Sequence, residues 1–211
     1  MREPINVSGM VLSASPVGEY DKRVVILTRE LGKITAFARG ARRMKSPLMA
    51  VSNPFVFGEF QVYEGRDSYT LSGANIKEYF LDLAQMQPGV YYGFYFLELA
   101  EYFGQEGNDE TQMLNLLYVT MNAIRRGKQD LRLIRCIFEL RTITISGEAP
   151  QMFSCMECST KENLTVFSLR DSAIYCQNCG KTIRDPWPLQ PGTVLACRYI
   201  IAAPLQKLYG F

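Results

Sequence analysis

The stretch VLSASPVGEYDKRVVILTRELGKITAFARGARRMKS, residues 11–46, decides the fold of the first part of the chain. Its apolar runs are separated by turn residues such as Pro16, Gly18 and Gly32, which is the pattern of short β-strands joined by tight turns. The same pattern continues on both sides of this stretch. The predicted strands span residues 6–15, 23–28, 33–38, 55–63 and 67–74. Short strands in so small a module predict a closed or nearly closed barrel, and the OB-fold is the commonest five-stranded form. An SH3-like barrel would give the same pattern.

The middle of the chain changes from a strand pattern to a helical one, with apolar residues at helical spacing. The predicted helices span residues 89–103, 111–126 and 131–145. Pro88 suits the start of the first helix. Asp109 and Gln112 have the spacing of a capping box at the second, and Gly127 can end it. These helices are expected to form a bundle, and a last helical pattern begins near Thr193.

Two C-x2-C pairs, CMEC at residues 155–158 and CQNC at residues 176–179, are separated by seventeen residues. This spacing is typical of a zinc site, because two residues between thiolates let one tight turn aim both sulfurs at one ion. Four thiolates complete a tetrahedron without water, so the expected Zn²⁺ is structural. Strands at residues 164–169 and 173–175 would form a hairpin that joins the pairs, and Gly180 supplies flexible backbone. Two disulfides, or four unligated thiols, are the alternatives. The predicted ligands are Cys155, Cys158, Cys176 and Cys179.

These patterns predict an α+β protein of several domains. The expected parts are an OB-fold barrel at residues 1–78, a helical bundle at 79–149, a four-cysteine zinc-finger module at 150–188 and a C-terminal helical segment at 189–211 that packs on the bundle. No run approaches the roughly 18 apolar residues that would span a bilayer. The opening MREPINVSGM lacks the apolar core of a signal peptide. We therefore expect a cytoplasmic protein.

Two features of the helical region are predicted to belong to the core. The aromatic run YYGFYF, residues 91–96, could line a ligand pocket. Aromatic residues at helical spacing mostly bury area, however, so packing of the bundle against the barrel is the stronger prediction, with some apolar surface left for a partner. Cys136 and Cys197 each lie alone in an apolar helical stretch, where packing is commoner than a redox role.

The chain contains no histidine, which excludes Ser-His-Asp and Cys-His nucleophile arrangements, the HExxH metalloprotease site and histidine general-base catalysis. The sequence also lacks a P-loop. These absences exclude several classes of enzyme. The formal net charge is only +2, so polyanion binding has to come from local clusters of charge.

One such cluster lies in and after the third predicted strand. No acidic residue occurs between Glu30 and Glu59, and the segment FARGARRMKS, residues 37–46, carries four cations within seven positions. A solvated loop without function is the alternative for any charge run. On an OB-type barrel, however, a nucleic-acid backbone usually follows a basic loop beside a strand face. The cations in question are Lys33, Arg39, Arg42, Arg43 and Lys45.

Aromatic residues of the predicted barrel could stack nucleobases, although strand alternation puts about half of them in the core. They are Phe37, Phe55, Phe57, Phe60, Tyr63 and Tyr69. The sequence assigns this role to none of them individually.

Several segments together resemble one known family. They are residues 11–46 quoted above, FVFGEFQVYEG at 55–65, the two C-x2-C pairs, and LQPGTVLACRYIIAAPLQKLYGF at 189–211. This combination resembles the RecO recombination-mediator proteins of bacteria over almost the whole chain, and residues 19–46 are the most specific part. The resemblance implies an amino-terminal OB-fold, a helical bundle and a zinc-finger module inserted before the last helices.

The resemblance also implies a function. Family members bind single- and double-stranded DNA, anneal complementary strands covered by single-stranded DNA-binding protein (SSB), and work with RecR in loading RecA recombinase. They are not known as enzymes, so the resemblance implies that this protein is not an enzyme. The four cysteines fall on the family's zinc positions. The residues that fall on the family's basic GARR-x-KS segment are Arg39, Arg42, Arg43 and Lys45, and those on its nearby basic positions are Lys33 and Arg23. These six basic residues are the predicted DNA-binding residues.

The acidic tail of SSB, which ends in aspartate and phenylalanine, would need a basic residue beside an apolar pocket. The pocket is expected in the helical bundle. The protein is expected to be bacterial and associated with the nucleoid. Typical relatives continue past the position of Phe211 through a further helical, often basic tail that this sequence does not contain.

An RNA-binding OB-fold and zinc-ribbon protein of transcription or translation is the main alternative. A preference for RNA, without strand annealing, would favour it. A metal-dependent nuclease is a third hypothesis, against which the lack of a clustered acidic motif argues.

Overall fold

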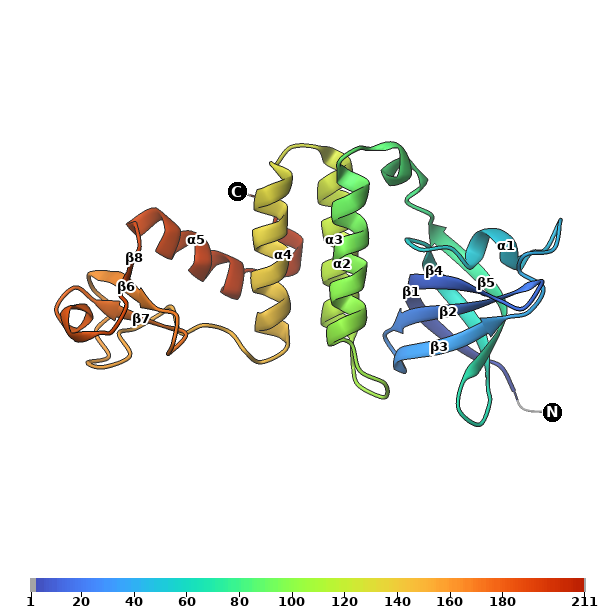
Figure 1. Ribbon diagram of the computed structural model, residues 1–211, viewed down its shortest axis with the longest axis horizontal. Coiled ribbons are helices and arrows are strands. Elements are labelled where there is room, and N and C mark those ends of the chain that lie inside the picture. The colour runs from blue at the N-terminus through green and yellow to red at the C-terminus, as the bar shows by residue number, and fades with distance from the viewer. Residues whose placement is uncertain (1–2, 211) are drawn as a thin grey trace. The chain divides into compact units, whose positions relative to one another are not determined.

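The structure of the protein is a computed structural model that describes residues 3–210 (Figure 1). The chain divides into two compact units, Met1–Arg135 and Cys136–Phe211, and helix α4 (Leu131–Ile145) contains the boundary. The predicted division into four domains stays a prediction, and its end points Met1 and Phe211 lie outside the described residues. Between residues 3 and 210, the helices are all too short or too polar to cross a membrane.

The first unit begins with a closed five-stranded barrel, drawn from blue to teal in Figure 1. Its strands are β1 (Ile5–Val17), β2 (Asp21–Thr28), β3 (Gly32–Ala38), β4 (Phe57–Glu64) and β5 (Tyr69–Glu78). They pair in the order β1-β2-β3-β5-β4, and β4 closes the barrel on β1. The β3–β5 pair is parallel, whereas the other pairs are antiparallel. The predicted barrel with the architecture of an OB-fold is thereby confirmed.

Alternation along the strands decides which residues fill this barrel. In β3 the side chains of Ile34, Ala36 and Ala38 are buried, whereas Lys33 and Phe37 are half-buried on the opposite face. Burying a side chain of valine or isoleucine size contributes roughly 1.5–3 kcal/mol, so this apolar face fixes the register of β3. Other strands complete the barrel core with Val7, Val11, Val24, Ile26, Phe60, Val62 and Leu71. Lys33 and Phe37 are therefore carried on the outside of the barrel.

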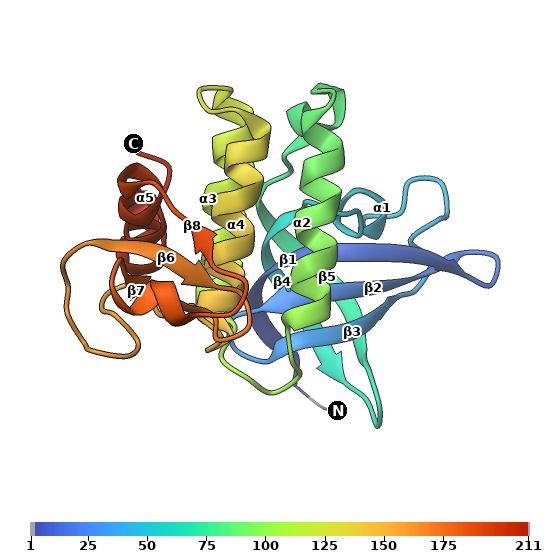
Figure 2. The same ribbon diagram turned by 60° about the vertical axis from the view of Figure 1, so that its left-hand side comes forward.

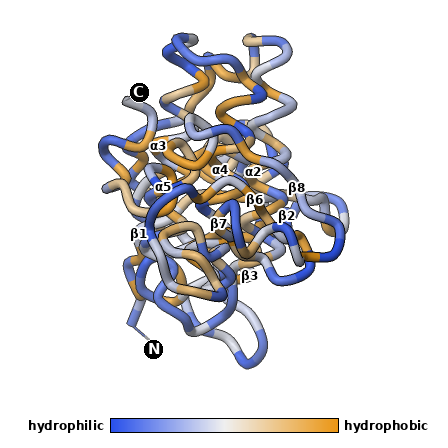
Figure 3. The backbone as a smooth tube through the Cα atoms, turned by 90° about the vertical axis from the view of Figure 1, so that its left-hand side faces the viewer, coloured by the Kyte–Doolittle hydropathy of each residue, from blue (hydrophilic) through white to orange (hydrophobic). Residues whose placement is uncertain are grey.

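Helices follow the barrel in the first unit. Between β3 and β4 lies the short α1 (Leu48–Val51), and a 3-10 turn (Leu81–Gln85) leads from β5 to α2 (Gly89–Phe103) and α3 (Thr111–Arg126). Figures 1 and 2 show α2 and α3 side by side. Figure 3 shows hydrophobic and hydrophilic residues mixed in the helical part of the chain. Helix α3 is amphipathic, whereas α2 is apolar around most of its surface, with Glu98 and Glu101 as its only charged residues. All three helices have the predicted bounds.

The caps of α3 follow the prediction only in part. Gly127 ends the helix in the left-handed conformation, with φ of 61°, as predicted. The predicted capping box from Asp109 to Gln112 is not formed, because the N-cap residue is Glu110 and its side chain makes no capping hydrogen bond. Asp109 instead accepts the backbone N–H of Thr111 at 2.9 Å.

The first residues of β3 fasten α2 to the barrel. The Lys33 ammonium donates a hydrogen bond of 2.6 Å to the backbone oxygen of Glu101, in the last turn of α2. Gly32 has a φ of 68°, and a Cβ there would lie 2.2 Å from a backbone oxygen beyond α2, so that only glycine fits. The rings of Phe55 and Phe94 meet edge to face at 4.7 Å. The aromatic run of α2 therefore packs partly on the barrel, as predicted.

The second unit contains a small sheet of strands β6 (Leu164–Ser168), β7 (Ala173–Cys176) and β8 (Trp187–Pro188) in the order β7-β6-β8. The antiparallel β6–β7 pair is the predicted hairpin. Helix α5 (Pro191–Ala202) packs on the sheet through Val194. The core of this unit includes Met152, Cys155, Leu164, Ile174, Cys176 and Val194. Two of the four paired cysteines are thus part of the unit's hydrophobic core.

The prediction that Cys136 and Cys197 are core residues is wrong for Cys136, which is exposed; Cys197 is half-buried. The buried positions of α4 include Ile134, Ile137 and Phe138, each with 0% of its surface exposed. Helical spacing turns position 136 away from the face that these residues form.

Candidate nucleic-acid interface and metal centre

The basic loop, residues 39–46, is folded back onto the turn between β1 and β2. The backbone N–H of Arg42 donates to Tyr20 O at 2.8 Å, and the Arg42 guanidinium donates to two further carbonyl oxygens of the same turn. At the start of the loop, Gly40 N–H donates to the Asp21 carboxylate at 2.7 Å. Backbone and side-chain hydrogen bonds therefore hold the loop in one conformation before any ligand binds.

Arg43 adds a stacking contact to this arrangement. Its guanidinium lies over the ring of Tyr20, 4.9 Å from the ring centre, and the ring is 41% exposed. A guanidinium that stacks on an aromatic face keeps its N–H donors at its edges, where they can reach a phosphate. The contact orients Arg43 without consuming its hydrogen-bonding capacity.

Three predicted cations have no partner within residues 3–210. Arg23, Arg39 and Lys45 are exposed, and their side chains make no hydrogen bond or ion pair with any residue that the structure describes. Arg23 lies opposite Phe37 in the β2–β3 register, and Arg39 is two residues beyond Phe37. The structure thus brings Arg23, Arg39 and the basic loop to one end of the β2–β3 pair.

Lys33 differs from the other predicted cations. It lies at the opposite end of β3, and its ammonium is held by the Glu101 carbonyl described above. The last carbonyls of a helix lack intrahelical donors and carry the negative end of the helix dipole, so a lysine there is stabilising. The structure gives Lys33 a role in the fold and sets it apart from the group around the basic loop.

The sequence analysis did not single out Lys22, which also lies close to this group. Its ammonium donates to the Asn53 side chain at 2.7 Å. Partial burial, together with the nearby positive charge of Arg42, lowers the pKa of Lys22 below its ordinary value. Only the fold brings Lys22, Asn53 and Arg42 together, so no local pattern could have indicated this contact.

The four paired cysteines converge on one point in the second unit. The sulfur atoms of Cys155, Cys158, Cys176 and Cys179 all lie within 4.8 Å of one another, and the sulfurs of Cys158 and Cys176 are 3.8 Å apart. Four sulfurs bound to one tetrahedral ion at 2.3 Å would be separated by about 3.8 Å. The spacing therefore fits a single four-thiolate metal site, and it does not fit two disulfides, whose sulfurs would be about 2.05 Å apart.

Backbone donors around the cluster favour the thiolate form of Cys155. Burial opposes its ionisation, but the backbone N–H groups of Cys158, Cys176 and Glu157 point at its sulfur and lower its pKa to about 6. The sulfurs of Cys176 and Cys158, by contrast, raise the pKa of Cys179 to about 12. The backbone N–H of Cys179 lowers the pKa of Cys176 as well, whereas the pKa of Cys158 is raised. Two thiolates thus form readily beside two thiols that resist ionisation, and a bound divalent cation would stabilise all four thiolates.

The structural reason for a glycine at position 180 differs from the predicted one. Its backbone does not adopt a positive φ. A Cβ at this position would instead lie 2.6 Å from the side chain of Val166 in β6. Glycine lets the segment after Cys179 approach the sheet closely.

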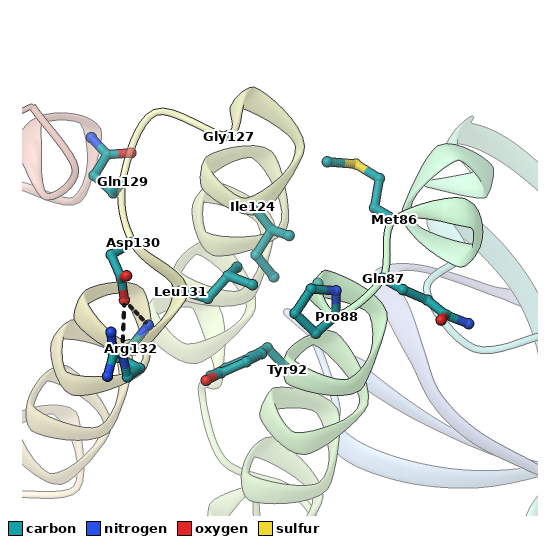
Figure 4. Close-up of a pocket in the computed structure, with 11 residues that line it drawn as sticks. Met86, Gln87, Pro88, Tyr92, Ile124, Gly127, Gln129, Asp130, Leu131 and Arg132 are labelled. Carbon is teal, nitrogen blue, oxygen red and sulfur yellow. Dashed lines mark hydrogen bonds and ion pairs between the residues drawn. The ribbon is translucent and has the colours of Figure 1, made fainter.

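An apolar pocket lies in the helical part of the first unit (Figure 4). Its volume is about 430 Å³, and Figure 4 shows Pro88, Tyr92, Ile124 and Leu131 pointing into it from the starts of α2 and α4 and the end of α3. Arg132 lies at its edge, 3.4 Å from the Asp130 carboxylate. The backbone N–H of Arg132 holds the pKa of Asp130 below its ordinary value. Tyr92 also lines a neighbouring pocket of about 300 Å³ with Tyr91, Tyr95 and Arg135.

Comparison with known proteins places these features in one family. Residues 1–80 match the family model described as "Recombination protein O N terminal", and residues 89–211 match "Recombination protein O C terminal". The chain belongs to the RecO family. The resemblance drawn from the sequence is therefore confirmed, together with a role in DNA repair and recombination and the prediction of a non-enzymatic mediator.

Individual relatives are similar along nearly the whole chain. The chain is 33% identical to the DNA repair protein RecO of Alkaliphilus metalliredigens, covering 97% of this chain and 83% of the relative. It is 31% identical to RecO of Bacillus pumilus, covering 97% and 79%, and 28% identical to RecO of Bacillus subtilis, covering 95% and 78%. The RecO match thus includes both the barrel and the four-cysteine unit.

Proposed function

We propose that this protein binds single- and double-stranded DNA and anneals complementary strands that are covered by SSB. The observation that carries the proposal is the group of exposed cations at one end of the β2–β3 pair, on a RecO-family barrel. These DNA-binding residues are Arg23, Arg39, Arg42, Arg43 and Lys45. Lys33 supports the interface by holding α2 on the barrel.

The proposed mechanism is electrostatic. Each cation replaces a counterion on a phosphate, so binding is independent of sequence and weakens steeply with salt. Five such contacts to a single strand correspond to a slope of about −3.5 for the logarithm of affinity against the logarithm of salt concentration. Neutralising phosphates on two strands lowers their mutual repulsion, and the bases can then pair without covalent chemistry.

The ion proposed for the four-cysteine cluster is Zn²⁺. Cys155, Cys158, Cys176 and Cys179 would hold it, and a four-thiolate site keeps no position for water or substrate, so its contribution is to stability. Burial of Cys155 and Cys176 in the core of the second unit supports this structural role.

The proposed partners follow from membership of the RecO family. In loading RecA, the protein would work with RecR, in the bacterial cytoplasm and on the nucleoid. The acidic SSB tail would place its terminal phenylalanine in the pocket lined by Pro88, Tyr92, Ile124 and Leu131. A carboxylate of the tail would take the place of Asp130 on Arg132, which is exposed and only loosely paired at 3.4 Å.

The experiment is fluorescence-monitored annealing of SSB-coated complementary strands. A variant with alanine at Arg39, Arg42, Arg43 and Lys45 should lose annealing, and its salt slope should fall by about 2.8. The control replaces four exposed lysines elsewhere, Lys128, Lys161, Lys181 and Lys207, with alanine and loses the same net charge. Equal loss of annealing in both variants would contradict a local interface. Tighter binding of RNA than of DNA, without annealing, would favour the RNA-binding alternative.

A further inference from the structure

One row of side chains crosses the outside of the barrel from β2 to β4. In the strand registers, Arg23 lies opposite Phe37, Phe37 lies beside Thr70 of β5, and Thr70 lies opposite Tyr63 of β4. Residues that are directly paired across strands point to the same face of a sheet. Since the neighbours of Phe37 along β3 are buried in the barrel, this face is the outer one.

Burial separates these two aromatic residues from the other four that the sequence analysis considered. Tyr63 is 37% exposed and Phe37 is half-buried, and neither belongs to the core cluster of the barrel. Phe60 is fully buried in that core and Tyr69 packs on it, whereas Phe55 and Phe57 pack on Phe94 and Tyr118 of the helices. Among the six, Phe37 and Tyr63 are the residues that the fold leaves facing outward.

We propose that Phe37 and Tyr63 are base-stacking residues for single-stranded DNA; this inference rests on the proposed DNA-binding function and deepens it. Side chains on the outer surface of a closed barrel point away from its axis, so the two rings diverge on either side of the smaller Thr70. Each ring is therefore a separate stacking surface. A strand that crosses β3, β5 and β4 can place one base on Phe37 and another on Tyr63.

Cations accompany the row where a DNA backbone would need them. Arg23 stands directly beside Phe37, and Arg39 follows in the turn that begins where β3 ends at Ala38. Both are exposed and unpartnered within the described part of the chain. Stacking of bases on aromatic rings, with phosphates held by arginine, is the general way in which proteins bind single strands without reading their sequence.

This geometry has a consequence for annealing. Bases that stack on rings at the outer surface of the barrel keep an edge exposed to solvent. An approaching complementary strand can reach that edge while the backbone of the first strand stays neutralised. The row would then hold a strand open for pairing.

The test compares two ligands with equal numbers of phosphates: oligo(dT) of about 15 nucleotides, near the upper end of the site sizes of OB-folds, and an abasic strand of the same length. Phe37→Leu and Tyr63→Leu keep apolar side chains and should each weaken oligo(dT) binding about tenfold, as the loss of one stacked base predicts. Binding of the abasic strand and the salt slope should stay unchanged. Arg23→Gln should weaken binding of both ligands and reduce the slope by about 0.7.

The matched control is Tyr79→Leu. Tyr79 is also 37% exposed, but it follows the far end of β5, nine residues from Thr70. It should leave the affinity for both ligands unchanged. A second readout uses Phe37→Trp in a Trp187→Phe background, which leaves the new side chain as the sole tryptophan. This protein should keep its affinity, and oligo(dT) should quench its fluorescence whereas the abasic strand should not.

The outcomes separate the two proposals. If the parent protein binds oligo(dT) and the abasic strand equally, with the expected salt slope, DNA binding stands and stacking is refuted. The same conclusion follows if both leucine variants bind oligo(dT) like the parent. If the parent binds neither ligand, the proposed function fails and the stacking proposal fails with it.

Discussion

Replacing Lys33 with methionine distinguishes a cation that holds the fold from one that contacts DNA. Methionine keeps the apolar stem of the side chain and removes the donor to Glu101 O, a distance of 2.6 Å in the structure. Glu101 lies in the last turn of α2, where carbonyl groups lack intrahelical partners. Without the lysine, the backbone oxygen of Glu101 has only water as a donor. Hydrogen bonds from charged donors contribute about 1.5–3 kcal/mol, and partial exposure of Lys33 favours the lower value, about 1.5 kcal/mol.

The size of the first unit converts this free energy into a melting temperature. For a folding unit of Met1–Arg135, 1 kcal/mol corresponds to a shift of about 4 °C, so Lys33→Met should lower Tm by about 6 °C. Thermal unfolding followed by far-UV circular dichroism measures this shift. Lys77→Met is the control, because Lys77 and Glu59 form an exposed ion pair at 2.8 Å that should contribute well under 1 kcal/mol.

DNA binding provides the second readout for the same variant. The salt slope of Lys33→Met, measured below its Tm, should equal that of the parent, whereas Arg39→Ala should reduce the slope by about 0.7 without changing Tm. The reasoning would be refuted if Lys33→Met melted like the parent and lost a phosphate contact. Lys33 would then belong to the DNA interface, as the sequence predicts.

Three further outcomes are expected. Cys176→Ser should release bound zinc, measured with a colorimetric chelator, and lower the thermal stability of the chain; a zinc-free variant as stable as the parent would contradict the structural role. Gly180→Ala should destabilise the second unit by about 1–3 kcal/mol, and Val166→Ala in the same chain should restore part of the loss, because a Cβ at position 180 would lie 2.6 Å from Val166. Burial opposes ionisation of Glu78, but hydrogen bonds from Arg125 outweigh it and lower its pKa below the ordinary value of a glutamate. Its stabilising contribution is therefore present above the unfolded-state pKa and lost as the pH falls through the lowered folded-state pKa, and Glu78→Gln should flatten the acid side of the stability profile; an unchanged acid limb would exclude this role.

Local periodicity was sufficient to predict most of the secondary structure. The helices α2, α3 and α4 have the predicted bounds, because their apolar spacing and the glycine at position 127 are properties of short segments. The α3 cap differs because Glu110 has another partner: its carboxylate accepts the backbone N–H of Gln105 at 2.9 Å. This half-buried contact between residues five apart fixes the start of α3 in place of a capping box.

The roles of the basic residues could be predicted only as a group. Charge clustering indicates the loop at residues 39–46, but the partner of Lys33 is 68 residues away in the sequence. The aromatic residues show the same limit. Alternation predicts that about half face outward, whereas the identity of that half depends on register and on bulges in β1 and β5, which pair with their neighbours irregularly. The pocket at Tyr92 combines segments from residues 86 to 132, and no local pattern joins them.

The anchored basic loop also bears on how quickly DNA leaves the protein. A segment that is already held by Asp21 and the Tyr20 carbonyl does not have to become ordered when a strand arrives, nor to unfold when it departs. On the proposed electrostatic mechanism, phosphates held by this loop are released as soon as ions return to them, which is a fast process. If the protein anneals strands as proposed, fast release from the loop would let it act on many strand pairs in succession.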